Sequence, residues 1–454
     1  MKRQQIFLLI ASILLVCLFI TNKSYCIDKE SKIYKNIYIE NIDVSNLTKN
    51  EAIEKLKKHV YVKHNIDLIH ENKIYKLPLN EIDFKFNIED KVNKALEIGR
   101  NDNRLRNIKT KINLTLGKNV HISLDSQYDK TKLNLYIKKL AKKLEIKPIN
   151  AKIKLENNNF KIDEEKYGIG VNEKLLENEI NKNIINKKFE NINLPMEKLE
   201  PKFTYKKLEK INTLLGSYET RFNLYNENRA SNIKLATKKT NGILIDSQDQ
   251  FSFNSIIGRR SNEAGFKNAP IIINGEAHMG TGGGICQVSS TLYNAAIYSG
   301  LEIIQAKNHT IPSSYIEKGR DATVSYGDID LIFKNNFKTP VLISNEVNGN
   351  KIVTNIYGSN EDKKTISIKT DIIKVIEYKT IEKENDLLYE GESQIETKGR
   401  NGYKVNTYRI YKNKDGLSNK ELINESYYPP KTQVVIKGTK KKINNIKKLH
   451  YKII

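Results

Sequence analysis

Cysteine is scarce in this sequence, which holds three cysteines among 454 residues. Cys17 lies inside an apolar run near the N-terminus, and Cys26 lies at the edge of that run. Cys286 therefore has no structural partner with which to form a disulfide. The sequence predicts that Cys286 is a free thiol.

Signals for nucleic-acid or metal binding are also missing. The chain has neither zinc-finger spacing nor a dense patch of arginine and aromatic residues, and the four histidines of its first half are scattered without ligand spacing. We expect no cofactor and no metal. The formal net charge is nevertheless +24, from 77 Lys and Arg against 53 Asp and Glu. This surplus favours anionic lipid headgroups or acidic wall polymers over nucleic acid, with a solvated lysine-rich surface as the alternative.

The N-terminus lacks an obvious cleavage site of the small-x-small type before Asp28. Its basic start at Lys2 and Arg3 precedes an uncharged apolar run from Ile6 to Ile20. Such a pattern is typical of a membrane-targeting segment with its basic end inside. We predict that residues 1–27 form a membrane anchor or signal segment, with a single-pass anchor favoured and the other domains extracellular in the cell wall. Cleavage of the segment would make the protein secreted.

A lone thiol outside the membrane indicates a reactive residue, because exported proteins usually pair their cysteines or carry none. A glycine run leads into Cys286, and the apolar residues after it recur at helical spacing until Gly300, which predicts a helix with a left-handed stop. The first turn of a helix favours an anion, so we expect a lowered pKa for the Cys286 thiol. The alternative is a buried structural cysteine behind a glycine turn.

The glycines before the cysteine suggest an acyl-transfer site. Without Cβ atoms, Gly283 and Gly284 would allow a substrate to approach the main chain. The backbone N–H groups around Cys286 could then face a developing oxyanion. Gln287 and Ser289 could donate hydrogen bonds in the first helical turn or cap the helix.

The length of the chain and the changes in sequence pattern along it predict an α+β multidomain protein. Residues 28–210 read as a duplicated α+β region, residues 215–360 as an α+β central domain, residues 365–439 as a small all-β domain, and residues 440–454 as a basic tail. The duplication consists of two predicted hairpins, 66–77 and 151–162, with helices before and after each. In the central domain we expect a helix between Glu227 and Lys238, a strand from Leu301 to Gln305 and a β-meander that ends near Tyr357.

The central segment, from about 221 to 359, resembles the VanW domain. The resemblance is carried by Phe251-Ser-Phe-Asn254, Gly282-Gly-Gly-Ile-Cys-Gln-Val-Ser-Ser290, Asn308-His309 and Gly319-Arg-Asp-Ala-Thr323. It implies a role in the cell wall, and members with this cysteine have been proposed to act as L,D-transpeptidases. The duplicated region resembles the peptidoglycan-binding modules that precede VanW domains. The C-terminal segment resembles the five-glycine adhesion domain, a family associated with wall glycans or amino sugars.

The central segment contains two histidines that could serve Cys286 as a base, His278 and His309. His309 falls on a motif position of the family, so we assign it the base role, with Asp321 as the group that orients its ring. His278 is expected to line the substrate, although His278 could serve as the base in place of His309. Arg320 is suited to gripping a carboxylate, and Arg320 and Asp321 could equally form a structural pair.

These residues suggest a reaction on peptidoglycan stems. We predict catalytic residues Cys286, His309 and Asp321, and substrate-binding residues His278, Gly283, Gly284, Gln287, Ser289 and Arg320. The working hypothesis is an L,D-transpeptidase that forms 3-3 cross-links through a thioester on Cys286. A cysteine peptidase or carboxypeptidase on the same stems and a non-catalytic wall-binding scaffold remain the alternatives.

Overall fold

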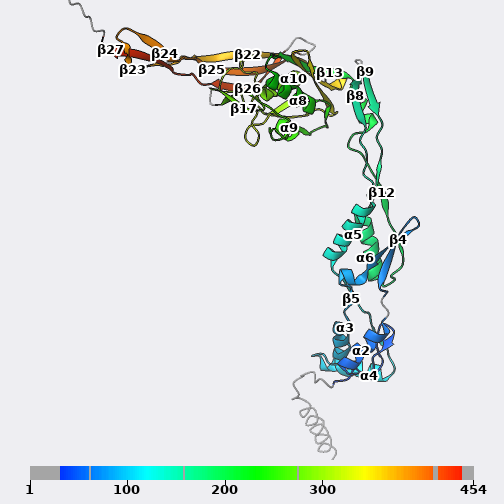
Figure 1. Ribbon diagram of the computed structural model, residues 1–454. Coiled ribbons are helices and arrows are strands. Elements are labelled where there is room, and N and C mark those ends of the chain that lie inside the picture. The colour runs from blue at the N-terminus through cyan, green and yellow to red at the C-terminus, as the bar shows by residue number, and fades with distance from the viewer. Residues whose placement is uncertain (1–30, 61–62, 157–158, 274–275, 413–417, 442–454) are drawn as a thin grey trace, which may run out of the picture. The chain divides into compact units, whose positions relative to one another are not determined.

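The computed structural model describes residues 31–60, 63–156, 159–273, 276–412 and 418–441 (Figure 1). These residues form two compact units. The N-terminal unit contains the described residues up to 148 together with 167–200, and the C-terminal unit contains 149–166 and the described residues from 201 onward. The predicted anchor or signal segment, residues 1–27, and most of the predicted basic tail lie outside the described residues. Within the described ranges no helix is long and apolar enough to cross a membrane.

The N-terminal unit packs helices onto small sheets. Its elements are β1 (Ile37–Ile39), β2 (Ile42–Asp43), α2 (Lys49–His59), β3 (Asn65–His70), β4 (Lys73–Pro78), η1 (Leu79–Ile82), β5 (Lys85–Phe86), α3 (Ile88–Glu97), α4 (Arg104–Thr115), β6 (Val120–Ile122), β7 (Ser126–Gln127), α5 (Lys130–Leu144), β10 (Gly168–Val171), α6 (Glu173–Ile185), β11 (Ile192–Asn193) and β12 (Met196–Leu199). One hydrophobic cluster gathers around α2 and α3, and another around α5 and α6. Local sequence sets the helix starts: Thr48 and Glu51 form a capping box before α2, and Asp129 caps α5.

Both predicted hairpins are confirmed, but they belong to different units. In the first, β3 pairs with β4 and places Ile66 opposite Leu77. The second is formed by β8 (Lys152–Glu156) and β9 (Asn159–Asp163), with Ile153 opposite Ile162. That hairpin shares a cluster with Phe203 and its neighbours, so it belongs to the C-terminal unit. The four predicted helices of the region are present as α2, α3, α5 and α6, yet the two hairpins do not form equivalent modules.

The C-terminal unit contains the remaining elements. They are α7 (Tyr205–Leu208), β13 (Thr213–Arg221), α8 (Glu227–Thr240), β14 (Ile243–Ile245), β15 (Gln250–Ser252), α9 (Phe253–Ile257), β16 (Asn268–Ile273), β17 (Glu276–Thr281), α10 (Ile285–Ser299), β18 (Glu302–Gln305), β19 (Ile332–Lys334), β20 (Val341–Asn348), β21 (Lys351–Gly358), η2 (Asn360–Asp362), β22 (Thr365–Ile376), β23 (Thr380–Tyr389), β24 (Ser393–Thr397), β25 (Gly402–Lys412), β26 (Ser418–Tyr428) and β27 (Gln433–Lys440).

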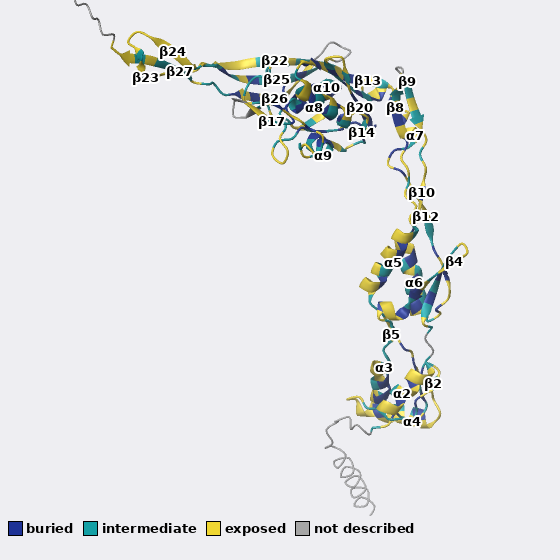
Figure 2. Ribbon diagram, viewed as in Figure 1, coloured by how far each residue is buried: buried dark blue, intermediate teal, exposed yellow. Residues whose placement is uncertain are grey.

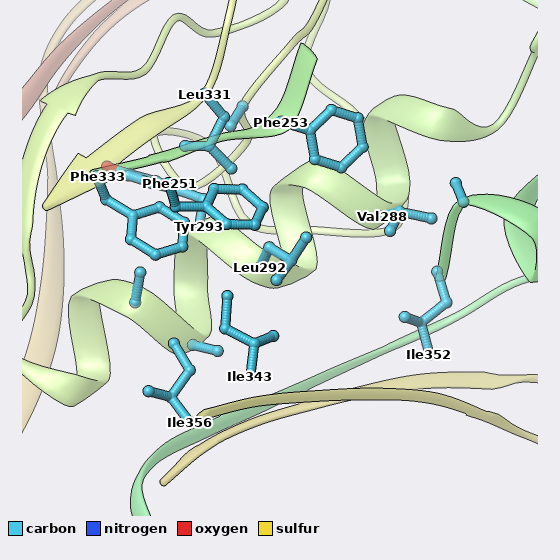
Figure 3. Packing of buried hydrophobic residues seen from close by; sticks show 14 of the residues in the cluster. Phe251, Phe253, Val288, Leu292, Tyr293, Leu331, Phe333, Ile343, Ile352 and Ile356 are labelled. Atoms are coloured by element: carbon cyan, nitrogen blue, oxygen red, sulfur yellow. The ribbon is translucent and has the colours of Figure 1, made fainter. Parts of the chain in front are cut away.

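The core of this unit surrounds α10, which is buried along nearly its whole length. The helix packs against β13 and β21 of the antiparallel sheet β13-β21-β20-β14 and against α8. Figure 3 shows Leu292 and Tyr293 of α10 close to Phe251 and Phe333. Gly216 lets the helix approach the sheet, because a Cβ there would lie 2.5 Å from the nitrogen of Ser299. The helix carrying Cys286 is therefore held by a rigid apolar core.

The sequence predicted two elements of the central segment correctly and a third only in part. The predicted helix between Glu227 and Lys238 and the strand ending at Gln305 are confirmed as α8 and β18. The expected meander is wrong at its first strand, because β19 pairs with β15 and β18 and only β20 and β21 form a hairpin. The alternation of Phe333 with its neighbours is typical of a strand, but a local pattern does not show which sheet the strand joins.

The C-terminal segment is a pair of three-stranded sheets, β22-β25-β26 and β23-β27-β24. The strands β23 and β24 are mostly exposed, while burial concentrates around α10 (Figure 2). The first sheet contacts the core directly: the Arg409 guanidinium on β25 donates to the carbonyl of Leu301 at 2.8 Å, just after α10 ends. This sheet is thus part of the same packed body as Cys286.

Candidate active site

The glycine loop before α10 is closely packed. Gly282 and Gly284 adopt positive φ values of 90° and 103°, a conformation that favours glycine. A Cβ on Gly283 would lie 2.5 Å from the carbonyl oxygen of Pro270, and one on Gly284 would lie 2.9 Å from Cγ of Arg229. The space beside these glycines is therefore filled by the protein itself, whereas the sequence had suggested an open approach for substrate.

Cys286 is the second residue of α10 and so lies in its first turn, as the sequence predicted, and the helix ends at Gly300 with φ 84°. Its sulfur lies 3.6 Å from Oγ1 of Thr323 and 3.7 Å from the carbonyl oxygen of Val324. Cys286 is a free cysteine that keeps part of its surface accessible although protein atoms surround it densely. A partly exposed cysteine at the start of a helix has the setting of a reactive thiol.

His309 and Asp321 form a tight pair. Nδ1 of His309 lies 2.6 Å from Oδ2 of Asp321, and the backbone N–H of His309 donates to the same oxygen at 2.7 Å. Asp321 is 1% exposed. Because Nδ1 is engaged by the carboxylate, Nε2 is the nitrogen left for Cys286.

The electrostatics favour an ion pair between the sulfur and the imidazole. Burial opposes ionisation of Cys286, but the hydrogen bond and the positive charge of His309 outweigh it and lower the thiol pKa to about 7. Burial likewise disfavours the imidazolium, but hydrogen bonds with Asp321 and Cys286 raise the pKa of His309 to about 10. Between these values the thiolate and the imidazolium exist together.

Two arginines add positive charge near the sulfur. Burial lowers the pKa of both Arg229 and Arg260, and the negative charge of Cys286 opposes that shift in each. Their stems pack on the glycine loop, Arg229 at Gly284 and Arg260 at Gly282. The glycines therefore create room for two cations that favour the thiolate.

Gln287, Ser289 and Arg320 are buried and engaged with the protein. Gln287 Nε2 donates to the carbonyl of Arg221 at 2.8 Å, and Ser289 Oγ donates to the carbonyl of Ala322 at 2.6 Å. Arg320 is 8% exposed, and its Nε donates to Oδ1 of Asn294 at 2.8 Å. The three side chains join α10 to β13 and to the segment that carries Asp321.

The sequence-predicted His278 and two further acidic residues of the central segment lie outside the group of Cys286, His309 and Asp321. His278 is exposed on β17, opposite Ile271 of β16 in the hairpin that leads into the glycine loop. Asp330 accepts from Ser252 Oγ at 2.6 Å, and Asp330 and Asp328 line a cavity of about 450 Å³. Across the described ranges no group of three or more His, Cys, Asp or Glu side chains is arranged to hold a metal ion. A larger cleft, of about 1330 Å³, lies in the N-terminal unit and contains none of the predicted catalytic residues.

Sequence reasoning missed Tyr428. Its hydroxyl donates to Oδ1 of Asp321 at 2.5 Å, across 107 positions of sequence, and Tyr428 is fully buried in β26. Arg229 and Arg260 were missed as well. No periodicity or motif links any of these residues to Cys286, so only the folded chain brings them to the site.

Three family models match separate segments of the chain. Residues 228–357 match the model described as VanW like protein, residues 75–193 a putative peptidoglycan binding domain, and residues 368–440 the G5 domain. The chain thus carries a VanW-like domain together with a peptidoglycan-binding domain and a G5 domain, a combination that indicates a cell-wall-related function. The resemblances to these three families are confirmed.

Two known protein sequences and two solved structures are similar to parts of the chain. The uncharacterized protein YoaR of Bacillus subtilis (strain 168) is 42% identical over 169 residues, which are 37% of this chain and 56% of the relative. The vancomycin B-type resistance protein VanW of Enterococcus faecalis (strain ATCC 700802 / V583) is 30% identical over 168 residues, 36% of this chain and 61% of the relative. The chain therefore spans somewhat more than half of the length of each relative.

Both solved structures are G5 domains. The G5 domain of an IgA1 protease is 28% identical, covers 17% of this chain and 94% of that domain, and has a TM-score of 0.14. The structure of HP0197-G5 is 21% identical, covers 16% of this chain and 97% of that structure, and has a TM-score of 0.12.

Proposed function

We propose that the chain is a cell-wall L,D-transpeptidase that forms 3-3 peptidoglycan cross-links through a thioester on Cys286. The observation that supports this function most is the group of Cys286, His309 and Asp321, in which the carboxylate holds the imidazole at 2.6 Å and the imidazole lowers the thiol pKa to about 7. This arrangement provides a nucleophile together with a proton carrier near neutral pH.

The proposed reaction begins with acylation of Cys286. The Cys286 thiolate attacks the carbonyl carbon of the third residue of a tetrapeptide stem, and a C–S bond forms as the carbonyl π electrons move to the oxygen. Backbone N–H groups near Gly284 to Cys286 hold the resulting oxyanion. The tetrahedral intermediate then collapses, the amide C–N bond breaks, and Nε2 of the His309 imidazolium gives its proton to the departing amine of D-alanine.

Transfer to a second stem reverses these roles. A neutral amine of a neighbouring stem attacks the thioester carbonyl, a C–N bond forms and the C–S bond breaks. Neutral His309 takes the proton that the amine loses, which restores the thiolate and the imidazolium. Asp321 keeps the imidazole in the tautomer that each step needs.

The predicted substrate-binding residues have different roles in the proposed reaction. His278 is exposed on the hairpin before the glycine loop, where it can line the path of a stem peptide. The buried settings of Gln287, Ser289 and Arg320 favour supporting roles for the catalytic segments. Gly283 and Gly284 contribute through their main chain.

The other domains fit a protein that acts on wall material. The peptidoglycan-binding and G5 segments support contact with the wall and an extracellular location. We propose that the N-terminal segment anchors the chain to the cell membrane and that basic side chains contact anionic wall polymers.

The decisive experiment is intact-mass analysis of the purified protein after incubation with a peptidoglycan tetrapeptide, or with a carbapenem as a trapped acyl donor. We expect a covalent adduct that maps to Cys286, and a 3-3 cross-linked dimer when an acceptor stem is added. Release of the free tripeptide without a dimer would indicate a carboxypeptidase. The absence of any adduct, together with an ordinary thiol pKa in alkylation, would support the scaffold.

A further inference from the structure

We propose that Tyr428, on the C-terminal sheet, is a positioning residue of this site: its hydroxyl holds the Asp321 carboxylate that orients His309. The kinetic part of this inference rests on the proposed function. The reactivity of the Cys286 thiol reports on the same contact whether or not cross-linking occurs. The active site would then be built jointly by the VanW-like segment, residues 228–357, and the G5 segment, residues 368–440.

The first support is that both oxygens of the Asp321 carboxylate accept hydrogen bonds. Oδ2 accepts from the backbone N–H and from the ring of His309, while Oδ1 accepts from the Tyr428 hydroxyl at 2.5 Å. The same hydroxyl accepts from the backbone N–H of Gly319 at 2.8 Å. A carboxylate that is 1% exposed needs donors on both oxygens, and two-sided bonding fixes its plane.

The second support is the docking of both catalytic segments on the C-terminal sheet. Thr407 Oγ1 on β25 donates to the carbonyl of Gly319 at 2.7 Å. Asn308 Nδ2, next to His309, donates to the carbonyl of Tyr427 on β26 at 2.9 Å. The turn that carries Asp321 and the loop that carries His309 are therefore both hydrogen-bonded to the same sheet.

Gly319 shows how close this contact is. Its φ is +86°, and a Cβ there would lie 2.7 Å from Oγ1 of Thr407 and 2.9 Å from Cγ1 of Val405. Only glycine combines this backbone conformation with this approach. The contact is thus a specific fit between two segments that the family models treat separately.

The alternative is a tyrosine that only fills space between the two segments. Tyr428→Phe and Thr407→Val separate the two roles, and both are made in the full chain. Each removes one buried hydroxyl from the contact around Gly319 and keeps the side-chain shape, but only Tyr428 touches Asp321.

We expect Tyr428→Phe to lower kcat about tenfold and to leave KM unchanged, because the lost hydrogen bond acts on the carboxylate and not on the substrate. The midpoint of iodoacetamide alkylation of Cys286 against pH should move upward, since a loosened Asp321 supports the imidazolium less. Thr407→Val removes a docking contact of the turn but leaves the contact between Tyr428 and Asp321 in place, so it should change both measurements clearly less than Tyr428→Phe does. Equal effects of the two variants, or no effect of Tyr428→Phe, would overturn the proposal.

A double-mutant cycle tests whether Tyr428 acts through Asp321. In an Asp321→Asn background, adding Tyr428→Phe should change neither the alkylation midpoint nor kcat further. An additional loss of the single-mutant size would show an independent role and would contradict the positioning assignment. If the wild-type chain forms no cross-links, the transpeptidase proposal fails while the alkylation midpoint still decides this one.

One readout does not depend on a substitution at Tyr428. With tyrosine labelled by ¹³C at Cζ, the resonance of Tyr428 should shift between the wild-type chain and Asp321→Asn. The resonance of Tyr411, whose hydroxyl contacts Glu421 at 3.1 Å, should stay in place. An unmoved Tyr428 resonance would show that the two groups do not interact in solution and would refute the proposal even if Tyr428→Phe fails to fold.

Discussion

The two compact units bury different kinds of residue. Among the described residues, Asn107 is the buried polar residue of the N-terminal unit, whereas the C-terminal unit buries many, including Asn294, Arg320, Asp321 and Thr407. Buried polar groups are costly unless they are fully hydrogen-bonded, and a satisfied network specifies one arrangement. The comparison indicates where the molecule maintains a precise geometry, namely around α10 and the segments docked on its N-terminal half.

Among substitutions in the two units, Cys286→Ala in the C-terminal unit should have the largest effect on activity. Acyl transfer should fall below detection because no other group replaces the thiolate, and the adduct should disappear from the intact mass. Cys26→Ser is the control, since it removes a cysteine outside the predicted site. Full activity of Cys286→Ala would end the covalent mechanism.

Asp321→Asn tests the buried polar network of the C-terminal unit, because it removes one buried charge from that network. We expect kcat to fall by a factor on the order of 10³, because the imidazole loses the group that sets its tautomer. The pKa of His309 should fall and that of Cys286 should rise, and steady-state kinetics with alkylation can measure both. Asp330→Asn is the matched control, since that carboxylate contacts Ser252 and Asn254 instead. A similar loss in both variants would argue against the His309 assignment.

The pH dependence should follow the paired ionisations. Activity should rise as the pH passes about 7, where Cys286 loses its proton, and fall as it passes about 10, where His309 loses the proton that the leaving amine needs. Initial rates across this range give the profile. A single rise near the ordinary thiol pKa, without a falling limb, would contradict the ion pair.

Asn107→Ala probes the buried polar residue of the N-terminal unit. Asn107 Oδ1 accepts from the backbone N–H of Asn101 at 3.0 Å, and its Nδ2 donates to the Asn101 carbonyl. The unit should lose about 1–3 kcal/mol of stability, visible as faster amide exchange at Asn101, while alkylation of Cys286 stays unchanged. The exposed Lys109→Ala is the control, and unchanged exchange in Asn107→Ala would refute the structural role.

Glu89→Gln should have the smallest effect. It breaks the ion pair between Lys49 and Glu89, whose side chains are 39% and 70% exposed. Water screens such pairs, so neither the thermal unfolding of the unit nor the reactivity of Cys286 should change measurably. A clear loss in either would show that surface charge contributes more to this unit than its buried contacts indicate.

Local patterns made much of the fold predictable. The helical spacing after Cys286 and the glycine at 300 predicted α10 with its left-handed end, and alternation with turn residues predicted the two hairpins. These signals work because helix periodicity, capping and turn conformation depend on residues a few positions apart. The pairing of β19 and the assignment of the second hairpin to a unit depend on distant partners, so the sequence did not reveal them.

The sequence alone determined a solitary thiol at the start of a helix, because the few other cysteines lie near the N-terminus and the glycine run and apolar spacing are local. Only the tertiary structure decided which groups surround that thiol. His309, Asp321 and Tyr428 come from three separate segments, and a buried carboxylate must find its donors wherever the chain packs. The physical reason is that hydrogen-bond partners in a core are selected by burial, which no short sequence pattern encodes.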